Sequence, residues 1–444
     1  IWSMGDELNS SPTKHWTERD HALLGVLQLD DQFYQFLGSE SKTYDAILPA
    51  SDEETYSVSY SESEPDETWI NPDYDASAWK TGEAPFSENE SMAKTIWNTA
   101  DLYYRRTFDL ETTDLESLFL KLNHDDNVNV WLNGIQIADI NGWQNSYKYL
   151  PVSQEAMQAL KTEGNVLAIH IRNTAGGQFL DAGLVTEAKS KSNEIIKKAK
   201  QLDVAFRANQ TEYTFDADGT QVNVTFTSPL LIEDLEIYSR PISYISVKVA
   251  GQEAHKAKVY LGTSSAIAIN QPVQEVEVSE YKNGALSILK AGSVAQPVLE
   301  KKGDDLRIDW GYLYVGAPAT NLKQFVTPAA QGLDAFVSGA IKDTNEKATG
   351  KNLILNTVAD LGEIDQEGTE QVFMIGYDQL EAVNYFGTAL KPWWSKDGAT
   401  MNEELTDAYT NYKDVIEKVK TFDQKLYEDA LASGGEKYAD LCVA

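Results

Sequence analysis

Cysteine is nearly absent from this sequence, and its scarcity removes two ways of stabilising a fold. Cys442 is the single cysteine among 444 residues, so the chain can form neither an internal disulfide nor a zinc site built from cysteines. The five histidines are scattered at positions 15, 21, 124, 170 and 255, without the spacing of metal ligands. We therefore expect no metal site of this kind and no cofactor. Low cysteine usage leaves the compartment open, because many exported bacterial proteins also lack disulfides.

Long apolar runs and an excess of positive charge are also lacking. No segment is apolar over the about 20 residues that a membrane-spanning helix needs, so we expect no membrane span. The chain carries 69 acidic against 37 basic side chains, a formal net charge of −32. Such a chain would be repelled by phosphate backbones and anionic lipid surfaces, which argues against nucleic acid as a partner. The ordinary interpretation of this acidity is a solvated surface.

Known catalytic motifs are missing as well. The sequence contains no Gly-x-Ser-x-Gly elbow, no His-Glu-x-x-His and no phosphate-binding loop. His15 and His21 could lie close together, but structural histidines are the more common outcome. No catalytic constellation can be assigned from the residues present, as expected for a supporting part of a larger enzyme.

What the sequence does contain is a long series of short strand patterns. Residues 220–227 alternate between polar and apolar side chains, as a strand with one buried face does. Asn133-Gly134 lies between two apolar runs and predicts a two-residue hairpin turn. From Asn402 the apolar spacing changes to three and four residues, which indicates an amphipathic helix that ends at Gly434-Gly435.

These patterns predict a mainly β protein: a large, supersandwich-like β-sandwich split in sequence, an inserted jelly-roll β-sandwich and a short C-terminal helical segment. We expect residues 1–50 to form the first segment of the large sandwich, 51–187 the jelly roll, 188–400 the main part and 401–444 the helical segment. The Lys-rich stretch 188–200 is expected to be a short connecting helix. A chain that stops inside an amphipathic helix is expected to be a fragment, and its start at Ile1 fits a removed signal peptide or a trimmed chain.

Four ordered blocks of residues are similar to the glutaminase A family. They are Ile1-Trp2-Ser3 with 11–17, 228–231 with 239–244, 303–314, and Gly376-Tyr377-Asp378 leading to Tyr385-Phe386-Gly387. The resemblance covers roughly 1–45 and 190–444, and residues 434–438 resemble that family's entry into a helical domain of six α-hairpins. It implies hydrolysis of the side-chain amide of L-glutamine to L-glutamate and ammonia, with the absent helical domain as the partner of this chain.

The middle of the chain carries a different resemblance. Residues 69–80, 103–108, 123–126 and 131–134 are similar to the galactose-binding-like jelly roll of β-galactosidase-type glycoside hydrolases. In this module Asp125, Asp126 and Trp143 could form a sugar site or a calcium site, because carboxylates bind hard cations and an indole can stack on a sugar. The favoured alternative is a solvated loop beside a core tryptophan. A small-molecule or carbohydrate ligand is the expected partner.

Aromatic residues gather where the β region meets the first helix. Trp393 and Trp394 follow Pro392 at this junction, where they could line a substrate cleft, although wedging two parts of the protein together is favoured. Asp378 and the pair Asp309-Trp310 supply candidate carboxylates and a ring facing the same junction. Each aspartate is more commonly a turn or pairing residue.

The sequence leads to one main interpretation and two alternatives. The main one is the N-terminal portion of a periplasmic or secreted bacterial glutaminase-like hydrolase, inactive alone, that supports a catalytic helical domain and contributes a cleft wall. Glycoside hydrolases also join a β-sandwich to helices, so part of a carbohydrate-active enzyme is the first alternative. A non-catalytic carbohydrate-binding or scaffolding protein is the second.

Overall fold

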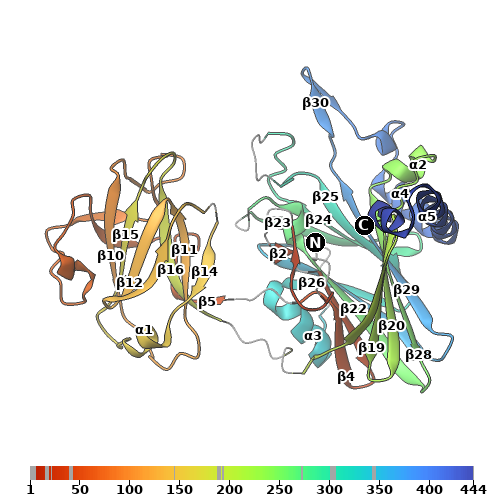
Figure 1. Cartoon of the computed structure of the whole chain (residues 1–444), viewed down its shortest axis with the longest axis horizontal. Helices are drawn as coiled ribbons and strands as arrows, with labels where there is room; N and C mark the ends of the chain where they lie inside the picture. Colours follow the sequence, from red (N-terminus) through yellow and green to blue (C-terminus); the bar gives the residue numbers. More distant parts are fainter. Residues whose placement is uncertain are drawn as a thin grey trace. The chain divides into compact units, whose positions relative to one another are not determined.

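The computed structural model describes residues 7–15, 20–21, 23–39, 44–144, 146–187, 192, 195–271, 274–300, 307–342 and 347–443. The chain divides into two compact units, which we call the large unit (Ile1–Ser41 with Ser190–Ala444) and the inserted unit (Lys42–Lys189). Figure 1 shows both units coloured along the sequence. Three stretches used for the glutaminase resemblance, namely Ile1-Trp2-Ser3, Trp16-Thr17 and 303–306, lie outside the described residues.

The inserted unit consists of two six-stranded sheets. The first sheet has the order β13 (Ile135–Ile140), β12 (Asn127–Leu132), β15 (Asn165–Arg172), β10 (Asp101–Phe108), β6 (Ser57–Ser61), β7 (Lys80–Glu83). The second has the order β14 (Lys148–Pro151), β11 (Phe119–Asp125), β16 (Phe179–Glu187), β8 (Phe86–Ser87), β9 (Thr95–Ile96), with β5 (Tyr44–Leu48) also paired to β16. Two short helical segments, η1 (Glu67–Ile70) and α1 (Gln154–Gln158), lie between strands.

The core of the inserted unit is formed by the inward-facing side chains of these sheets. Strand β12 alternates between partly exposed and buried residues along its whole length, and fully buried rings such as Trp97 and Tyr104 fill the centre. Asn133 and Gly134 both have positive φ, 50° and 86°, and connect β12 to β13. The hairpin turn predicted from Asn-Gly is therefore confirmed.

The large unit also has two main sheets. The six-stranded sheet has the order β17 (Lys197–Lys198), β4 (Gln32–Leu37), β3 (Leu23–Leu29), β22 (His255–Ser264), β28 (Leu353–Ile364), β26 (Leu322–Pro328). The nine-stranded sheet has the order β18 (Lys200–Phe206), β19 (Gln210–Ala217), β20 (Thr220–Thr227), β21 (Ile242–Gly251), β29 (Thr369–Asp378), β25 (Tyr312–Pro318), β24 (Leu286–Ser293), β23 (Val276–Asn283), β27 (Lys347–Gly350). Two small hairpins pair β1 (Thr13–Lys14) with β2 (Asp20–His21), and β30 (Val383–Tyr385) with β31 (Thr388–Leu390).

The large sandwich is split in sequence. Strand β3 pairs antiparallel with β22, so that Leu27 lies opposite Val259 across an interval of more than 200 residues. Apolar side chains of both sheets, including Phe36, Phe215 and Phe373, form one buried cluster between them. The first strands therefore contribute to a core whose other members come after the inserted unit.

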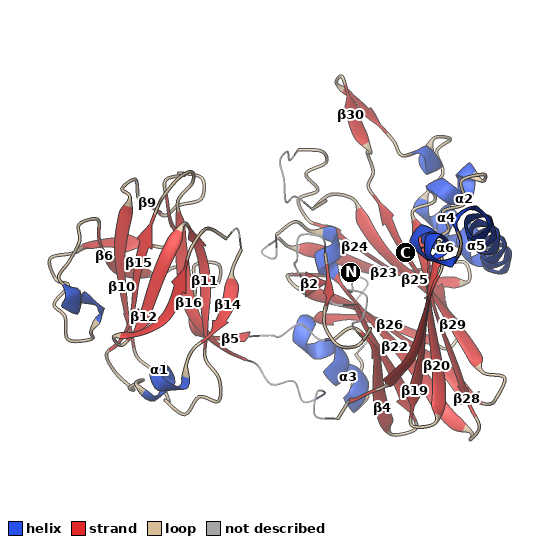
Figure 2. Ribbon diagram, in the orientation of Figure 1, coloured by secondary structure: helices blue, strands red, loops and turns tan. Residues whose placement is uncertain are grey.

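The C-terminal helices cover one face of the nine-stranded sheet (Figure 2). The helical segments of the large unit are α2 (Leu235–Ser239), η3 (Ser265–Ala268), η4 (Ala329–Gln331), α3 (Gly332–Ser338), η5 (Trp393–Ser395), α4 (Met401–Thr410), α5 (Tyr412–Gly434) and α6 (Glu436–Val443). Leu405 of α4 and Val415 and Val419 of α5 are buried in one cluster with Tyr244 of β21. Thr400 begins α4 with a capping box that includes Glu403.

The expected fold class is confirmed: the chain is mainly β, with two β-sandwiches and short C-terminal helices. Two details differ from the expectation. Strand β5, placed with the large sandwich, pairs with β16 of the inserted unit. The expected helix over 188–200 is wrong in its described part, because Lys197–Lys198 pairs in parallel with β4 and Lys200 begins β18. Among the described residues, no helix is long and apolar enough to cross a membrane.

Candidate functional site

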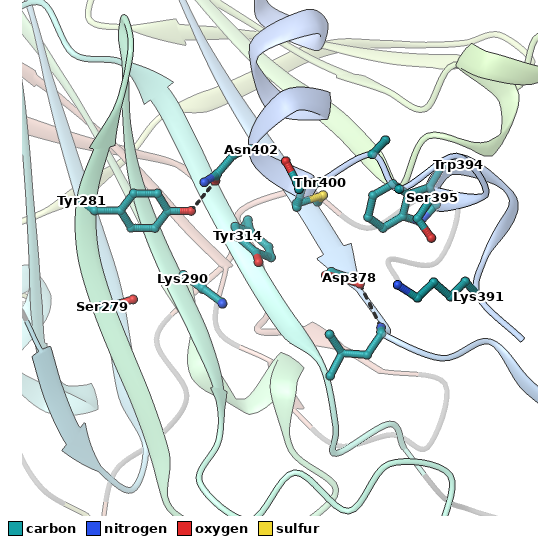
Figure 3. A pocket seen from close by; sticks show the side chains of 14 residues that line it. Ser279, Tyr281, Lys290, Tyr314, Asp378, Lys391, Trp394, Ser395, Thr400 and Asn402 are labelled. Carbon is teal, nitrogen blue, oxygen red and sulfur yellow. Dashed lines mark hydrogen bonds between the residues drawn. The ribbon is translucent and has the colours of Figure 1, made fainter. Parts of the chain in front are cut away.

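A pocket of about 490 Å³ opens in the large unit where η5 and the beginning of α4 meet the nine-stranded sheet. Figure 3 shows side chains from strands and from the η5–α4 segment turned toward this space. The side chains that carry its chemistry are Tyr281, Lys290, Tyr314, Asp378, Lys391 and Trp394. The pocket thus combines aromatic rings, hydroxyls and charges of both signs.

Strand pairing explains why residues distant in sequence meet at this pocket. Ser279 of β23 lies opposite Lys290 of β24, and Lys290 lies opposite Tyr314 of β25. Directly paired residues point to the same face of a sheet, so these three side chains form a row across three strands. Asp378 ends the neighbouring strand β29 and faces the same side, because its cross-strand partner is Tyr312, two residues from Tyr314.

The other wall of the pocket is the amino end of α4. Tyr281 donates a hydrogen bond from its hydroxyl to Asn402 Oδ1 at 2.7 Å. Asn283 donates from Nδ2 to the carbonyl oxygen of Asn402 at 2.8 Å and to Thr406 Oγ1 at 3.0 Å. These bonds tie the first turn of α4 to strand β23. The pocket therefore has a rigid helical wall as well as a rigid sheet floor.

Burial sets the protonation of the groups in the pocket. Desolvation raises the pKa of Tyr281 to about 12 and raises the pKa of Tyr314 well above its usual range. Desolvation also lowers the pKa of Lys290, whose Nζ lies 3.6 Å from the centroid of the Tyr312 ring. Near neutral pH the tyrosine hydroxyls are therefore uncharged donors.

Two of the five candidates at the junction line the pocket. Asp378 lies at its edge, where Oδ1 accepts a hydrogen bond from the backbone N–H of Leu380 at 2.9 Å. Trp394 also lines it and is 6% exposed, within the cluster formed by α4 and the sheet. Trp393 is 50% exposed, with the Lys396 ammonium 4.4 Å from its ring centroid. The two indoles lie in a 3₁₀ turn, η5, so the strand alternation of side chains does not govern them.

The other two junction candidates have structural contacts. Trp310 donates from Nε1 to the carbonyl oxygen of Gln379 at 2.9 Å, and its own carbonyl accepts from the Tyr377 hydroxyl at 2.7 Å. Asp309 is fully buried and accepts from Gln274 Nε2 at 2.9 Å. Neither residue lines the pocket in the described part of the chain. Both hold the segment that leads into β25.

Sequence reasoning missed Tyr281, Lys290, Tyr314 and Lys391. A weak signal was present, because Ser279, Tyr281 and Asn283 recur at every second position of β23, and Tyr312 and Tyr314 do so at the start of β25. Their convergence depends on the pairing order β23, β24, β25, β29, in which β25 and β29 are neighbours although more than 50 residues separate them.

The candidate site of the inserted unit has a different character. Asp126 Oδ2 accepts hydrogen bonds from the Thr174 backbone N–H at 2.7 Å, the Thr174 hydroxyl at 2.6 Å and the Ala175 N–H at 3.0 Å. Asp126 therefore fixes the loop after β15. Trp143 is 61% exposed, so the expected core tryptophan is wrong. Among the described residues, no group of three His, Cys, Asp or Glu side chains could hold a metal ion, and the suggested calcium site is not assembled there.

A second pocket, of about 370 Å³, lies in the inserted unit beside β6, β7 and β10. Arg105 lines it, but this side chain is 3% exposed and donates to the carbonyl oxygens of Trp69 and Asn71. Its guanidinium also lies 5.3 Å from the ring centroid of Tyr74. Arg105 thus holds the loop that contains Trp69 and Asn71 in place.

Three family models match segments of the chain. Residues 60–177 match the β-galactosidase second all-β domain, residues 209–429 match a domain of unknown function, DUF5127, and residues 1–49 match another, DUF4964. A comparison with curated proteins gives no match. The first match agrees with the resemblance drawn from the middle of the sequence.

Solved structures of β-glucuronidases share local similarity with the chain. A Faecalibacterium prausnitzii β-glucuronidase is 12% identical with a TM-score of 0.26, covering 48% of this chain and 44% of its own. Bacteroides uniformis β-glucuronidase 2, covalently bound to cyclophellitol-6-carboxylate aziridine, is 12% identical with a TM-score of 0.27, covering 63% of this chain and 31% of its own. A glycosyl hydrolase family 2 member from Bacteroides cellulosilyticus is 9% identical with a TM-score of 0.26, covering 61% and 34%.

All three TM-scores lie below 0.5, so the likeness does not extend to the chain as a whole. The chain spans less than half the length of each of them.

The resemblance to the glutaminase A family is corrected by these findings. The segments on which it was based match domains of unknown function, and the module between them matches a β-galactosidase domain. No matching model describes a glutaminase. The glutaminase activity and the six-hairpin domain inferred from that resemblance are therefore withdrawn, and the C-terminal helices belong to the large unit.

Proposed function

We propose that this chain is the β-rich part of a glycoside hydrolase-like protein, and that the pocket between the nine-stranded sheet and α4 binds a saccharide. The observation that carries the proposal is the match of residues 60–177 to a β-galactosidase domain. A carbohydrate-active enzyme was the first alternative drawn from the sequence, and this match favours it over an amidohydrolase.

The chemistry of the pocket supports a saccharide ligand. Sugar hydroxyls both donate and accept hydrogen bonds, and the pocket offers partners of both kinds. Tyr314 directs its hydroxyl toward the space (Figure 3), and this hydroxyl has no protein hydrogen-bond partner in the described part of the chain. Asp378 supplies an acceptor, and Trp394 and Tyr281 supply ring surface. Preformed sites of this kind, with a few placed polar groups on an aromatic wall, are typical of small-ligand pockets.

The proposal assigns binding to this chain and leaves bond cleavage aside. Glycoside hydrolysis usually requires two carboxyl groups about 5–10 Å apart, one as acid and one as nucleophile or base. Asp378 is the single carboxylate among the described residues that line the pocket. A pocket with one carboxylate favours a binding subsite, which also suits the second alternative, a non-catalytic carbohydrate-binding protein. The periplasmic or secreted location expected from the sequence stays part of this proposal.

The proposal is tested by titrating the 444-residue chain with a panel of neutral and acidic saccharides, followed by NMR or calorimetry. We expect saturable binding that weakens about three- to tenfold in Tyr314→Phe, the effect of losing one hydrogen bond from a buried hydroxyl. The matched control is Tyr238→Phe, because Tyr238 is 46% exposed on α2 and does not line the pocket.

Absence of binding by every saccharide, or equal effects of the two substitutions, would reject the proposal. Release of nitrophenol from aryl glycosides by the same chain would show that cleavage also belongs to it.

A further inference from the structure

The charge of the pocket is opposite to that of the protein. Two ammonium groups, Lys290 and Lys391, and one carboxylate, Asp378, are the charged groups among the described residues that line it, which leaves a formal charge of +1. The whole chain carries −32. A positive recess on a strongly negative molecule is an arrangement that attracts an anionic group and holds it at one place.

Lys290 carries the partly buried positive charge of the pocket. Its ammonium has no ion-pair partner among the described residues and rests instead against the rings of Tyr312 and Tyr314, 3.6 Å and 5.6 Å from their centroids. Burial lowers the pKa of Lys290 because the ammonium loses water, and the nearby charges of Asp378 and Glu277 offset this loss only in part. An anion entering the pocket would restore the interaction that this ammonium lacks.

The carboxylates near Lys290, Glu277 and Asp378, form no ion pair with it in the described part of the chain. Glu277, the nearby carboxylate on β23, receives the Lys347 ammonium at 2.9 Å. Asp378 acts on Lys290 through its charge but forms no ion pair with it, and its Oδ1 accepts from the Leu380 N–H. Lys396, which lies beyond the pocket lining, pairs with Glu236 at 2.8 Å. Lys290 and Lys391, unlike Lys347 and Lys396, therefore have no ion-pair partner among the residues that the structure describes.

We infer that the pocket binds an acidic saccharide, with Lys290 and Lys391 receiving its carboxylate or sulfate group and the Tyr314 hydroxyl and Asp378 receiving its hydroxyls. This inference rests on the proposed function and narrows its ligand class. Lys290 approaches from the sheet floor and Lys391 from the segment before η5 (Figure 3). The two ammonium groups therefore reach the ligand from different elements.

The test compares three probes that differ in one group: methyl galactoside, methyl galacturonide and methyl galactoside 6-sulfate. We expect the 444-residue chain to bind at least one acidic probe about tenfold more tightly than the neutral one, the effect of one added charged hydrogen bond. The acidic preference should decrease as salt is raised, while binding of the neutral probe stays constant. The carboxylate and sulfate arms show which anionic group is preferred.

Substitutions test whether the acidic probe binds at this pocket. Lys290→Gln and Lys391→Gln should each lower affinity for the acidic probe about tenfold, and Lys290→Arg should retain it because the charge remains. Lys282→Gln is the matched control: Lys282 is exposed on β23 but points to the opposite face, one residue after Tyr281. Unfolding midpoints of all variants show whether a loss reflects folding.

Three outcomes overturn the inference. Equal binding of neutral and acidic probes rejects the acidic ligand and leaves the saccharide site standing. An acidic preference that persists in both Lys→Gln variants rejects this pocket as its location. Absence of binding by all three probes and by the wider saccharide panel rejects the inference together with the proposed function.

Discussion

Buried charged side chains of the inserted unit have protein partners, whereas one pocket of the large unit contains an ammonium group without an ion-pair partner among the described residues. In the inserted unit, Asp181 accepts hydrogen bonds from the hydroxyls of Tyr56, Tyr147 and Ser51, and Lys121 pairs with Asp52 at 2.7 Å. In the large unit, buried Asp423 likewise accepts from Asn209 Nδ2 at 2.7 Å, but half-buried Lys290 forms no ion pair with any described residue. Buried polar groups are normally satisfied within the protein, so the pocket around this unpaired ammonium is the better candidate for ligand binding.

The match to the β-galactosidase domain and the candidate ligand pocket lie in different units. The β-galactosidase domain model covers the inserted unit, whose conspicuous residues Arg105 and Asp126 are occupied by loop carbonyls and loop donors. The pocket with available groups lies in a segment matched only by a domain of unknown function. The match therefore shows only what the inserted unit is similar to, and our proposal places the ligand at the unsatisfied side chains of the other unit.

The largest expected change in the free energy of unfolding concerns Trp393 and Trp394. It tests how the residues beside the pocket are packed. Trp394 is 6% exposed within the cluster of α4 and the sheet, and Trp393 is 50% exposed. Trp394→Ala should reduce the free energy of unfolding by about 3–5 kcal/mol, because it leaves a cavity in a packed cluster. Trp393→Ala should cost about 1 kcal/mol or less, from the lost contact with Lys396. Urea denaturation of both variants measures the difference, and equal losses would contradict the packing described.

A smaller effect is expected from Asp181→Ala in the inserted unit. Asp181 is fully buried and also accepts from the Ser51 N–H at 3.0 Å. Its removal leaves buried hydroxyls without an acceptor and should destabilise the inserted unit by about 3 kcal/mol. We propose that this unit folds as a domain of its own, so saccharide binding at the Lys290 pocket should be unchanged in the variant.

Denaturation and ligand titration of the same sample test that independence. A loss of pocket affinity in Asp181→Ala would show that the two units are coupled, and the comparison between them would fail.

Strands were predictable from the sequence because one buried face produces alternation. Residues 220–227 were expected as a strand, and β20 has the same bounds. Pairing partners were not predictable, because alternation says which face is buried but not which strand lies beside it. Strand β5 pairs with β16 rather than with its neighbours in sequence, and Lys197–Lys198 adopts a strand because the edge of β4 is available to it.

The candidate site was predictable only in part for the same reason. Asp378 and Trp394 were found because they stand beside a change of periodicity, where a junction is expected. Lys290 and Tyr314 gave no signal as single residues, since each lies inside an ordinary strand. Their proximity depends on the register that places Lys290 opposite Tyr314, and register is a property of the folded sheet.

The smallest effect concerns two adjacent carboxylates of the inserted unit whose pKa values shift in opposite directions. Burial, with the neighbouring charge of Asp126 adding to it, raises the pKa of Asp125 to about 6. Hydrogen bonds donated by Thr174 hold the pKa of Asp126 at about 2. An aspartate in an unfolded chain has a pKa of about 4. The folded protein therefore binds an extra proton at Asp125 between about pH 4 and 6, and lacks one at Asp126 between about pH 2 and 4.

The consequences for stability have opposite signs. The contribution of Asp125 is lost as pH rises from about 4 to 6, and that of Asp126 is lost as pH falls from about 4 to 2. Asp125→Asn should flatten the fall in the free energy of unfolding between about pH 4 and 6. It should raise stability at pH 7 by less than about 1 kcal/mol, because solvent screens this partly exposed group. Asp139→Asn, at an exposed position of β13, is the control and should leave the slope unchanged. Denaturation between pH 3.5 and 7 measures both, and a steeper slope in Asp125→Asn would contradict the direction of the shift, since a neutral amide cannot release the proton that the carboxyl group holds.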